Sequence, residues 1–478
     1  MNARLEQDLT QLDDLLAAAQ RFSADLLSRV DELPASIAMP EQAEALLPED
    51  GAGAIATLSR FREQYGTYLA AGAGPRYWGF VTGGVTPAAL AGDWLAAAID
   101  MNAADKGGAA FNIEIEALQL LRQLFGLPDT FAGSFVTGAT MSNFTGLAVA
   151  RQWLGRQQGK DIGQQGLGVL HDVRVLSCVP HSSVPKCLSM LGIGRDALVK
   201  IPALPLRESV NIAALESWLE EHKGQPVIYV ASAGTVNTTD FDDIAALAAL
   251  KQRYNFWLHV DAAFGGFAAC SPKYRHLLKG WEEADSITID AHKWMNVPYD
   301  SAMIFCRHPD LQAETFKNVG AAYLGDPAKD FNFIHHVPEN SRRLRALPAW
   351  YSLLAYGRQG YRDIVEDNVN QAKLLGSLID DSPHFMLLAP VNLCVACFTL
   401  NLPQEELADA TASFLDTLAA RGVAFMTPTV YKDMPAIRAA LVNWRTTEDD
   451  VRKTWQEMEE IAKSVELCHN PIIQQKLT

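Results

Sequence analysis

Lys293 lies four residues past the end of an apolar run, residues 286–289, that has the length of a buried strand. A lysine at the end of such a strand is partly desolvated, and desolvation disfavours the charged ammonium form. The neutral amine is the better nucleophile towards an aldehyde. Lys293 is therefore a candidate for Schiff-base chemistry, and a solvated loop lysine is the alternative that this stretch leaves open.

Asp261 closes a second apolar run, residues 257–260. A carboxylate in that place is costly unless a cationic or donor group pairs with it. A protonated pyridine nitrogen is such a partner, and a carboxylate beside it keeps the ring protonated and able to act as an electron sink. The small residues Ala262, Ala263 and Gly265 leave room for a flat ring. A helix cap or a turn aspartate remains the alternative.

Residues 133–144 contain a strand that turns through Gly138 into a helix. The first turn of a helix has free N–H groups, and hydroxyl side chains lie beside them here, so the segment can cradle a phosphate. The GxxxxGK pattern of nucleoside-triphosphate loops is missing, and so is the GxGxxG pattern of dinucleotide sites. The predicted phosphate site therefore belongs to another class of ligand.

His181 and Thr235 follow two further apolar runs, residues 174–178 and 227–231. Each alone is as easily a hydrogen-bonded loop residue. Together, five strand ends present a phosphate cradle, a histidine, a threonine, an aspartate and a lysine. Ligands of open α/β sheets bind beyond the carboxyl ends of the strands, where these residues would meet.

The elements that must position these residues alternate along the chain. Six apolar runs separated by helical stretches indicate a mostly parallel sheet covered on both faces: residues 134–137, 174–178, 227–231, 257–260, 286–289 and 302–306. Helical segments at 348–378, 405–421 and 447–467, with a strand at 394–400, indicate a smaller α+β unit. We predict an N-terminal helical segment (1–74), a large α/β domain (75–340) and a small α+β domain (341–478).

With these residues in place, the chain resembles the group II amino acid decarboxylases, which use pyridoxal 5′-phosphate (PLP) and include aromatic-amino-acid, glutamate and histidine decarboxylases. The block 260–300 is the most specific, and His-Lys-Trp-Met-Asn-Val-Pro-Tyr-Asp at 292–300 is similar to the HKWLNVPYD of bacterial members. The resemblance covers roughly residues 65–465. It implies PLP fold type I, the aspartate-aminotransferase type, with a mostly parallel seven-stranded sheet. It also implies a homodimer with its sites at the subunit interface, the N-terminal segment packing on the partner.

The resemblance further implies a role for each candidate residue. Lys293 would hold PLP as a Schiff base, Asp261 would pair with the pyridine nitrogen, and His181 would stack over the ring. These three are the predicted catalytic residues. The phosphate would be held by Ala139, Thr140 and His292, and the ring pocket would be lined by Thr235 and Ala263.

Two departures from the family pattern matter. Members often have Asn two residues before the phosphate-binding histidine, whereas this chain has Asp290, which we leave out of the site. In aromatic-amino-acid decarboxylases a loop tyrosine returns a proton after CO₂ is lost, and here that position falls on Phe333. A phenylalanine there accompanies aldehyde synthase activity in plant and insect relatives. His335 and His336 are the other candidates for the acid.

The overall composition argues against several other functions and partners. The net charge of −16 argues against nucleic acid or an anionic membrane as a partner. No signal peptide or apolar span is recognisable at the start, and scattered cysteines, with one isolated CxxC at 394–397, favour buried thiols over a metal site. We expect a cytoplasmic enzyme that decarboxylates an L-amino acid, and Tyr77, Trp78 and Phe80 are the pocket candidates that favour an aromatic or apolar side chain. Aldehyde synthesis, transamination, aldol cleavage and a non-catalytic homologue are the alternatives.

Overall fold

A seven-stranded sheet forms the centre of the chain in the computed structural model, which describes residues 2–42, 44–103, 106–319 and 331–469. The strand order is β1-β7-β6-β5-β4-β2-β3, and only β7 runs against its neighbours. The strands are β1 (Ala132–Val136), β2 (Arg174–Ser177), β3 (Leu198–Lys200), β4 (Val227–Ser232), β5 (Trp257–Asp261), β6 (Ser286–Asp290) and β7 (Ala302–Cys306). The predicted α/β class and mostly parallel sheet are confirmed.

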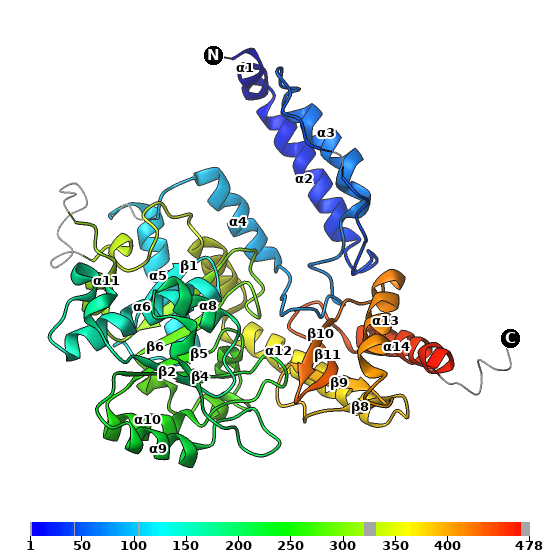
Figure 1. Cartoon of the computed structure of the whole chain (residues 1–478). Helices are drawn as coiled ribbons and strands as arrows, with labels where there is room; N and C mark the ends of the chain where they lie inside the picture. The colour runs from blue at the N-terminus through cyan, green and yellow to red at the C-terminus, as the bar shows by residue number, and fades with distance from the viewer. Residues whose placement is uncertain (1, 43, 104–105, 320–330, 470–478) are drawn as a thin grey trace.

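Helices cover both faces of this sheet (Figure 1). The helices between residues 87 and 316 are α4 (Pro87–Ile99), α5 (Ala109–Phe125), α6 (Ala139–Gln157), α7 (Ile162–Gln165), α8 (Ser183–Met190), α9 (Ile212–Glu221), α10 (Ile244–Tyr254) and α11 (Pro309–Phe316), of which α5, α6 and α10 contact the strands. All the residues of β4, β6 and β7 are buried, as strands covered on both faces require.

A second sheet of four antiparallel strands follows, in the order β10-β11-β9-β8. It consists of β8 (Phe385–Leu387), β9 (Val395–Leu400), β10 (Thr427–Tyr431) and β11 (Met434–Ala440), and packs with α12 (Ala346–Asp380), α13 (Leu407–Arg421) and α14 (Glu448–His469). At the start of α14, Thr447 and Asp450 form reciprocal hydrogen bonds: Asp450 N donates to Thr447 Oγ1 and Thr447 N donates to Asp450 Oδ2. This is a capping box, which accounts for the predicted start of this helix.

Three N-terminal helices project from the rest of the molecule (Figure 1). They are α1 (Ala3–Thr10), α2 (Leu12–Ser28) and α3 (Ala54–Tyr65), and none of them has a buried residue within this single chain. No helix among the described residues is long and apolar enough to span a membrane.

Candidate active site

A pocket of about 390 Å³ opens at the carboxyl ends of the parallel strands. All eight predicted cofactor-binding residues line it: Ala139, Thr140, His181, Thr235, Asp261, Ala263, His292 and Lys293. They come from five separate strand ends, as the sequence predicted. The remaining wall includes Phe80, Val81, Thr137, Gly138, Met141, Val179, Ser232, Gly234, Val236, Phe264, Asp290, Tyr299 and Arg438.

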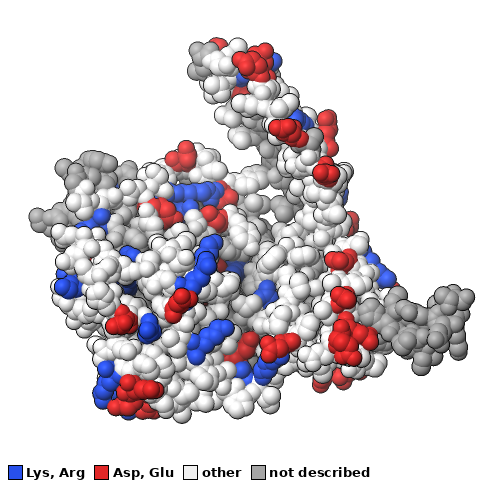
Figure 2. Space-filling view, in the orientation of Figure 1, with Lys and Arg blue, Asp and Glu red and all other residues white. Residues whose placement is uncertain are grey.

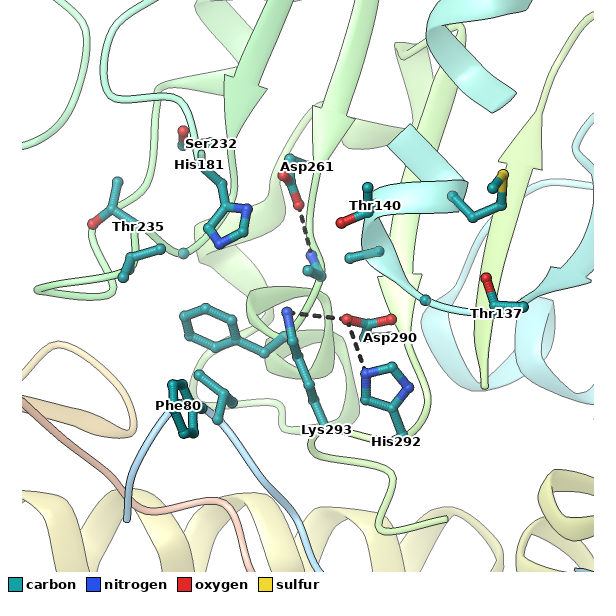
Figure 3. Close-up of a pocket in the computed structure, with 18 of the residues that line it drawn as sticks. Phe80, Thr137, Thr140, His181, Ser232, Thr235, Asp261, Asp290, His292 and Lys293 are labelled. Atoms are coloured by element: carbon teal, nitrogen blue, oxygen red, sulfur yellow. Dashed lines mark hydrogen bonds and ion pairs between the residues drawn. The ribbon is translucent and has the colours of Figure 1, made fainter. Parts of the chain in front are cut away.

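Lys293 extends into the middle of this pocket from the turn after β6 (Figure 3). Its Nζ lies 3.0 Å from Oδ2 of Asp290 and 5.8 Å from the centre of the Phe264 ring. The other Asp290 oxygen, Oδ1, is buried and has no hydrogen-bond partner among the described residues. The amine thus lies between an aromatic face and one carboxylate, within reach of a ligand in the pocket.

Asp261 lies at the end of β5, and two donors fix its carboxylate. Oδ2 accepts a hydrogen bond of 2.9 Å from the Asn143 amide, and Oδ1 accepts one of 3.2 Å from the backbone N–H of Ala263. Both donors hold the carboxylate in one orientation at the pocket wall. This satisfies the requirement that a carboxylate at a buried strand end have partners.

The His181 ring points into the pocket between Thr235 and Asp261 (Figure 3). Its Nδ1 accepts a hydrogen bond of 3.2 Å from Ser183 N and lies 2.7 Å from Ser183 Oγ. Burial lowers the pKa of His181, although nearby Asp261 opposes that shift. The ring is therefore neutral near pH 7 and can lie flat against another aromatic ring.

The start of α6 lies opposite His292. A Cβ at Gly138 would come within 3.3 Å of Cε1 of His292, so a side chain here would narrow the space between them. His292 Nδ1 accepts from Ser301 N at 3.2 Å, which leaves Nε2 as the protonated nitrogen of the neutral ring. Burial lowers the pKa of His292, partly offset by Asp290, whose Oδ2 is 3.5 Å from Nε2. A phosphate could accept hydrogen bonds here from the N–H groups at the start of the helix, from the Thr140 hydroxyl and from the imidazole N–H.

Three pocket or near-pocket residues were not identified from the sequence. Arg438 reaches the pocket from β11 and donates to the backbone oxygens of Val236 (3.1 Å) and Phe80 (2.6 Å). The Tyr299 ring contacts His292 in a tilted arrangement, with 4.3 Å between ring centres and 31° between ring planes. Asn143 binds Asp261 from within α6. The only signal for Arg438 was a charge inside an apolar strand, which requires a partner when buried.

Other sequence candidates lie elsewhere. Of the three aromatic residues proposed for substrate binding, Phe80 lines the pocket, Trp78 is fully buried in the core of the second sheet, and Tyr77 stacks on Phe425 at 4.8 Å. Those two predictions, for Tyr77 and Trp78, are not supported by the geometry.

Phe333 is fully buried in its own subunit, 5.1 Å from both Phe111 and Phe331 between ring centres, and does not line this pocket. His335 and His336 are also buried outside it. Among the described residues, no group of three or more His, Cys, Asp or Glu side chains is arranged to hold a metal ion.

Comparison with known proteins agrees with this geometry. Residues 41–401 match the model of the pyridoxal-dependent decarboxylase conserved domain. An aromatic-L-amino-acid decarboxylase of Bacillus atrophaeus is 28% identical over 409 residues, covering 83% of this chain and 82% of that protein. A histidine decarboxylase of Rattus norvegicus is 30% identical over 400 residues, covering 79% of this chain and 59% of that protein.

A crystal structure of Oryza sativa TDC with PLP and tryptamine superposes with a TM-score of 0.88 at 22% identity, covering 95% of this chain and 98% of that one. This likeness agrees with fold type I. The family match extends over most of the chain and includes every strand end that lines the pocket. The chain therefore belongs to the pyridoxal-dependent decarboxylase family.

Proposed function

We propose that this protein removes the α-carboxylate of an L-amino acid as CO₂, with PLP held in the pocket described above. The observation that carries the proposal is the convergence of Lys293, Asp261 and His181 at a helix start suited to phosphate. PLP, when bound, supplies a protonated pyridine ring that takes up the electrons of the broken Cα–carboxylate bond.

The residues of this chain divide the work of holding that group. Lys293 offers the amine that attaches it, and Asp261 offers an acceptor for the ring N–H. His181 provides a neutral flat face against the ring, while Thr235 and Ala263 bound its edge. Ala139, Thr140 and His292 provide the donors for phosphate. The chemistry of this donor set fits PLP at both ends of the pocket.

We propose a substrate with an aromatic or other apolar side chain. Phe80, Phe264 and Tyr299 give the pocket three aromatic walls, and Val81 and Val236 add apolar surface. Arg438 is the cation at this wall besides Lys293, and its guanidinium already serves two backbone oxygens. An acidic substrate side chain would thus have to compete with these two backbone oxygens for hydrogen bonds from Arg438.

We further propose a cytoplasmic homodimer in which residues 1–74 pack on the partner, followed by domains 75–340 and 341–478. The absence of buried residues in α1, α2 and α3 of the single chain supports such packing. Tyr77 and Trp78 nevertheless pack with the second sheet, so the first residues after 74 join the small domain. The six described cysteines are free and buried, which fits a reducing compartment.

We propose no nucleic acid or membrane partner. Acidic and basic side chains are interspersed over the face shown in Figure 2, and the net charge is −16. Such a surface offers little attraction to a polyanion.

The test is a screen of L-amino acids in which CO₂, amine, aldehyde and peroxide are measured together. Release of CO₂ with an equal amount of amine supports decarboxylation. Aldehyde with peroxide supports the aldehyde synthase alternative. Amino-group transfer to an added oxo acid without CO₂ would refute both.

A further inference from the structure

Four polar side chains beneath the pocket are completely buried: Asn143, Trp257, His259 and Ser286. They form one chain of hydrogen bonds that ends on Asp261. Trp257 Nε1 donates to Ser286 Oγ (3.0 Å), and Ser286 Oγ lies 2.7 Å from His259 Nδ1. His259 Nε2 lies 2.9 Å from Asn143 Oδ1, and Asn143 Nδ2 donates to Asp261 Oδ2 (2.9 Å). Each link has ordinary hydrogen-bond length.

The direction of every bond in this chain follows from its two ends. The indole N–H of Trp257 can only donate, so Ser286 Oγ accepts from it and has its own hydrogen for His259 Nδ1. At the other end an ionised carboxylate can only accept, so the Asn143 amide nitrogen faces Asp261. Its oxygen then faces His259, whose Nε2 must carry the hydrogen. In every hydrogen bond of this chain, the donor is therefore the residue farther from Asp261.

The same amide also reaches His181. Asn143 Nδ2 lies 3.2 Å from Ser183 Oγ, and Ser183 Oγ lies 2.7 Å from Nδ1 of His181. Since Nδ1 of His181 also accepts from Ser183 N, the free N–H of that ring is on Nε2. Asn143 is thus a branch point between the aspartate and the histidine that face the pocket.

The surroundings keep His259 in place and neutral. A Cβ at Gly146 would lie 2.8 Å from Cε1 and Nδ1 of His259, so the glycine leaves the space that the ring occupies. Burial lowers the pKa of His259 to about 4, against a weaker opposite effect of Asp261. A neutral imidazole can accept at one nitrogen and donate at the other, as the chain requires.

We propose that Asn143 and His259 are positioning residues: the directed chain from Trp257 sets the His259 tautomer and thereby holds Asp261, and through Ser183 His181, in the orientation needed at the ring. This inference rests on the proposed function, because it assigns to the chain the task of orienting the two side chains that face the cofactor. It concerns residues that do not themselves line the pocket.

Two substitutions at His259 separate positioning from packing. In His259→Gln the amide nitrogen can take the place of Nε2 and donate to Asn143. In His259→Asn the shorter side chain reaches the Nδ1 position and can bind Ser286 only. Leaving the buried Asn143 oxygen without its donor corresponds to about 5- to 150-fold. We expect kcat of the PLP-loaded enzyme to fall by that factor in His259→Asn, with little change in KM, and to be largely retained in His259→Gln.

A second measurement keeps the inference testable if His259→Asn fails to fold. The nitrogen-15 spectrum of histidine-labelled holoenzyme should show His259, assigned by its absence in His259→Gln, protonated at Nε2 only. Ser286→Ala removes the donor to Nδ1 and should lower kcat, while Nε2 keeps the hydrogen that Asn143 accepts. A wild-type His259 protonated at Nδ1, or equal losses of kcat in the Gln and Asn variants, would overturn the proposal. Wild-type protein that binds no PLP would refute the proposed function instead, while the tautomer would still be measurable.

Discussion

Nζ of Lys293 and Oδ2 of Asp290 lie 3.0 Å apart across the turn that follows β6. The aspartate is 1% exposed, and its second oxygen has no partner among the described residues, so the lysine is its closest cation. Removing one partner of a buried ion pair destabilises the folded protein, because the other charge is left buried and unpaired. The amine is thus held at one place on the pocket wall, and its neighbour is the residue at which this chain departs from the Asn that is frequent in the family.

Lys293→Ala should abolish covalent attachment of PLP. Borohydride reduction of the wild-type holoenzyme should fix a pyridoxyl group on the peptide that contains Lys293, as mass spectrometry can show, because this amine projects into the pocket. The reduced Lys293→Ala protein should carry no label. Lys186→Ala, in α8, is the matched control and should label like the wild type. A labelled Lys293→Ala protein would show that another lysine holds the cofactor.

Asp261→Ala should impair turnover much more than folding. Loss of a charge-assisted hydrogen bond at the reacting group corresponds to about 2–4 kcal/mol in the barrier, or roughly 30- to 1000-fold in rate. The measurement is kcat at saturating PLP, with the free energy of unfolding from urea titration.

Asp243→Ala is the control for the Asp261 variant. Asp243 caps α10 by accepting a hydrogen bond from Ala246 N at 3.0 Å and does not line the pocket. Its loss should cost about 1 kcal/mol of stability and leave kcat unchanged. Wild-type turnover in Asp261→Ala would rule out the proposed pairing with the ring nitrogen.

The sequence predicted those parts of the fold and site that have local signals. Six of the seven strands of the large sheet were found because each is an apolar run bounded by polar or turn residues. The missed strand, β3, has only three residues, which is too short a run to be recognised as a strand from the sequence. No helix or strand was predicted for residues 161–168, which contain the short helix α7, capped by Asp161 through Gln164 N. A segment of four residues is too short for the apolar periodicity of a helix to be recognised in the sequence.

Contacts between distant segments could not be derived from the sequence. Arg438 follows Phe80 by 358 positions, and only the packing of β11 beside the pocket brings them together. His259 did offer a signal, since a polar residue inside a buried strand must have partners. The identity of those partners, Asn143 and Ser286, depends on the register of β5 with β6 and on the placement of α6.

Charges on the N-terminal helices should weaken the proposed dimer. Leu5 and Leu9 of α1 are 62% and 63% exposed, and Leu12 and Leu16 of α2 are 43% and 59% exposed; each pair is four residues apart and so lies on one face of its own helix. The double substitution Leu12→Asp and Leu16→Asp should raise the dissociation constant measured by sedimentation. Leu206→Asp, at a leucine of the large domain that is 84% exposed, is the control and should have no effect. An unchanged dimer in the double variant would place the interface elsewhere.

Phe333→Tyr should leave the product ratio unchanged. Phe333 is fully buried beside Phe111, Phe331 and the guanidinium of Arg342, and it does not line the pocket of its own subunit. A phenol there would gain no contact with the ligand, and an unpartnered buried hydroxyl costs about 1–3 kcal/mol. Peroxide formed per CO₂ released, in air, should therefore match the wild type, while the free energy of unfolding decreases. A fall in peroxide would mean that this residue faces the site of the partner subunit.

Acid should destabilise the wild type more than His259→Gln. The pKa of His259 is lowered to about 4 by burial, whereas histidine in an unfolded chain titrates at about 6.5. Between these values only the unfolded chain is protonated at this residue, so its contribution to stability is lost as the pH falls from about 6.5 to about 4.

Asp242 acts in the opposite direction, because burial raises its pKa to about 7 and its protonated form favours the folded state over the same range. Both proteins contain Asp242, so the difference between their unfolding free energies isolates His259. At one fixed protein concentration, we expect that difference to shift by about 2–3 kcal/mol against the wild type between pH 7 and pH 4.5. Parallel stability curves for the two proteins would show that His259 titrates alike in the folded and the unfolded chain, contrary to the effect of its burial.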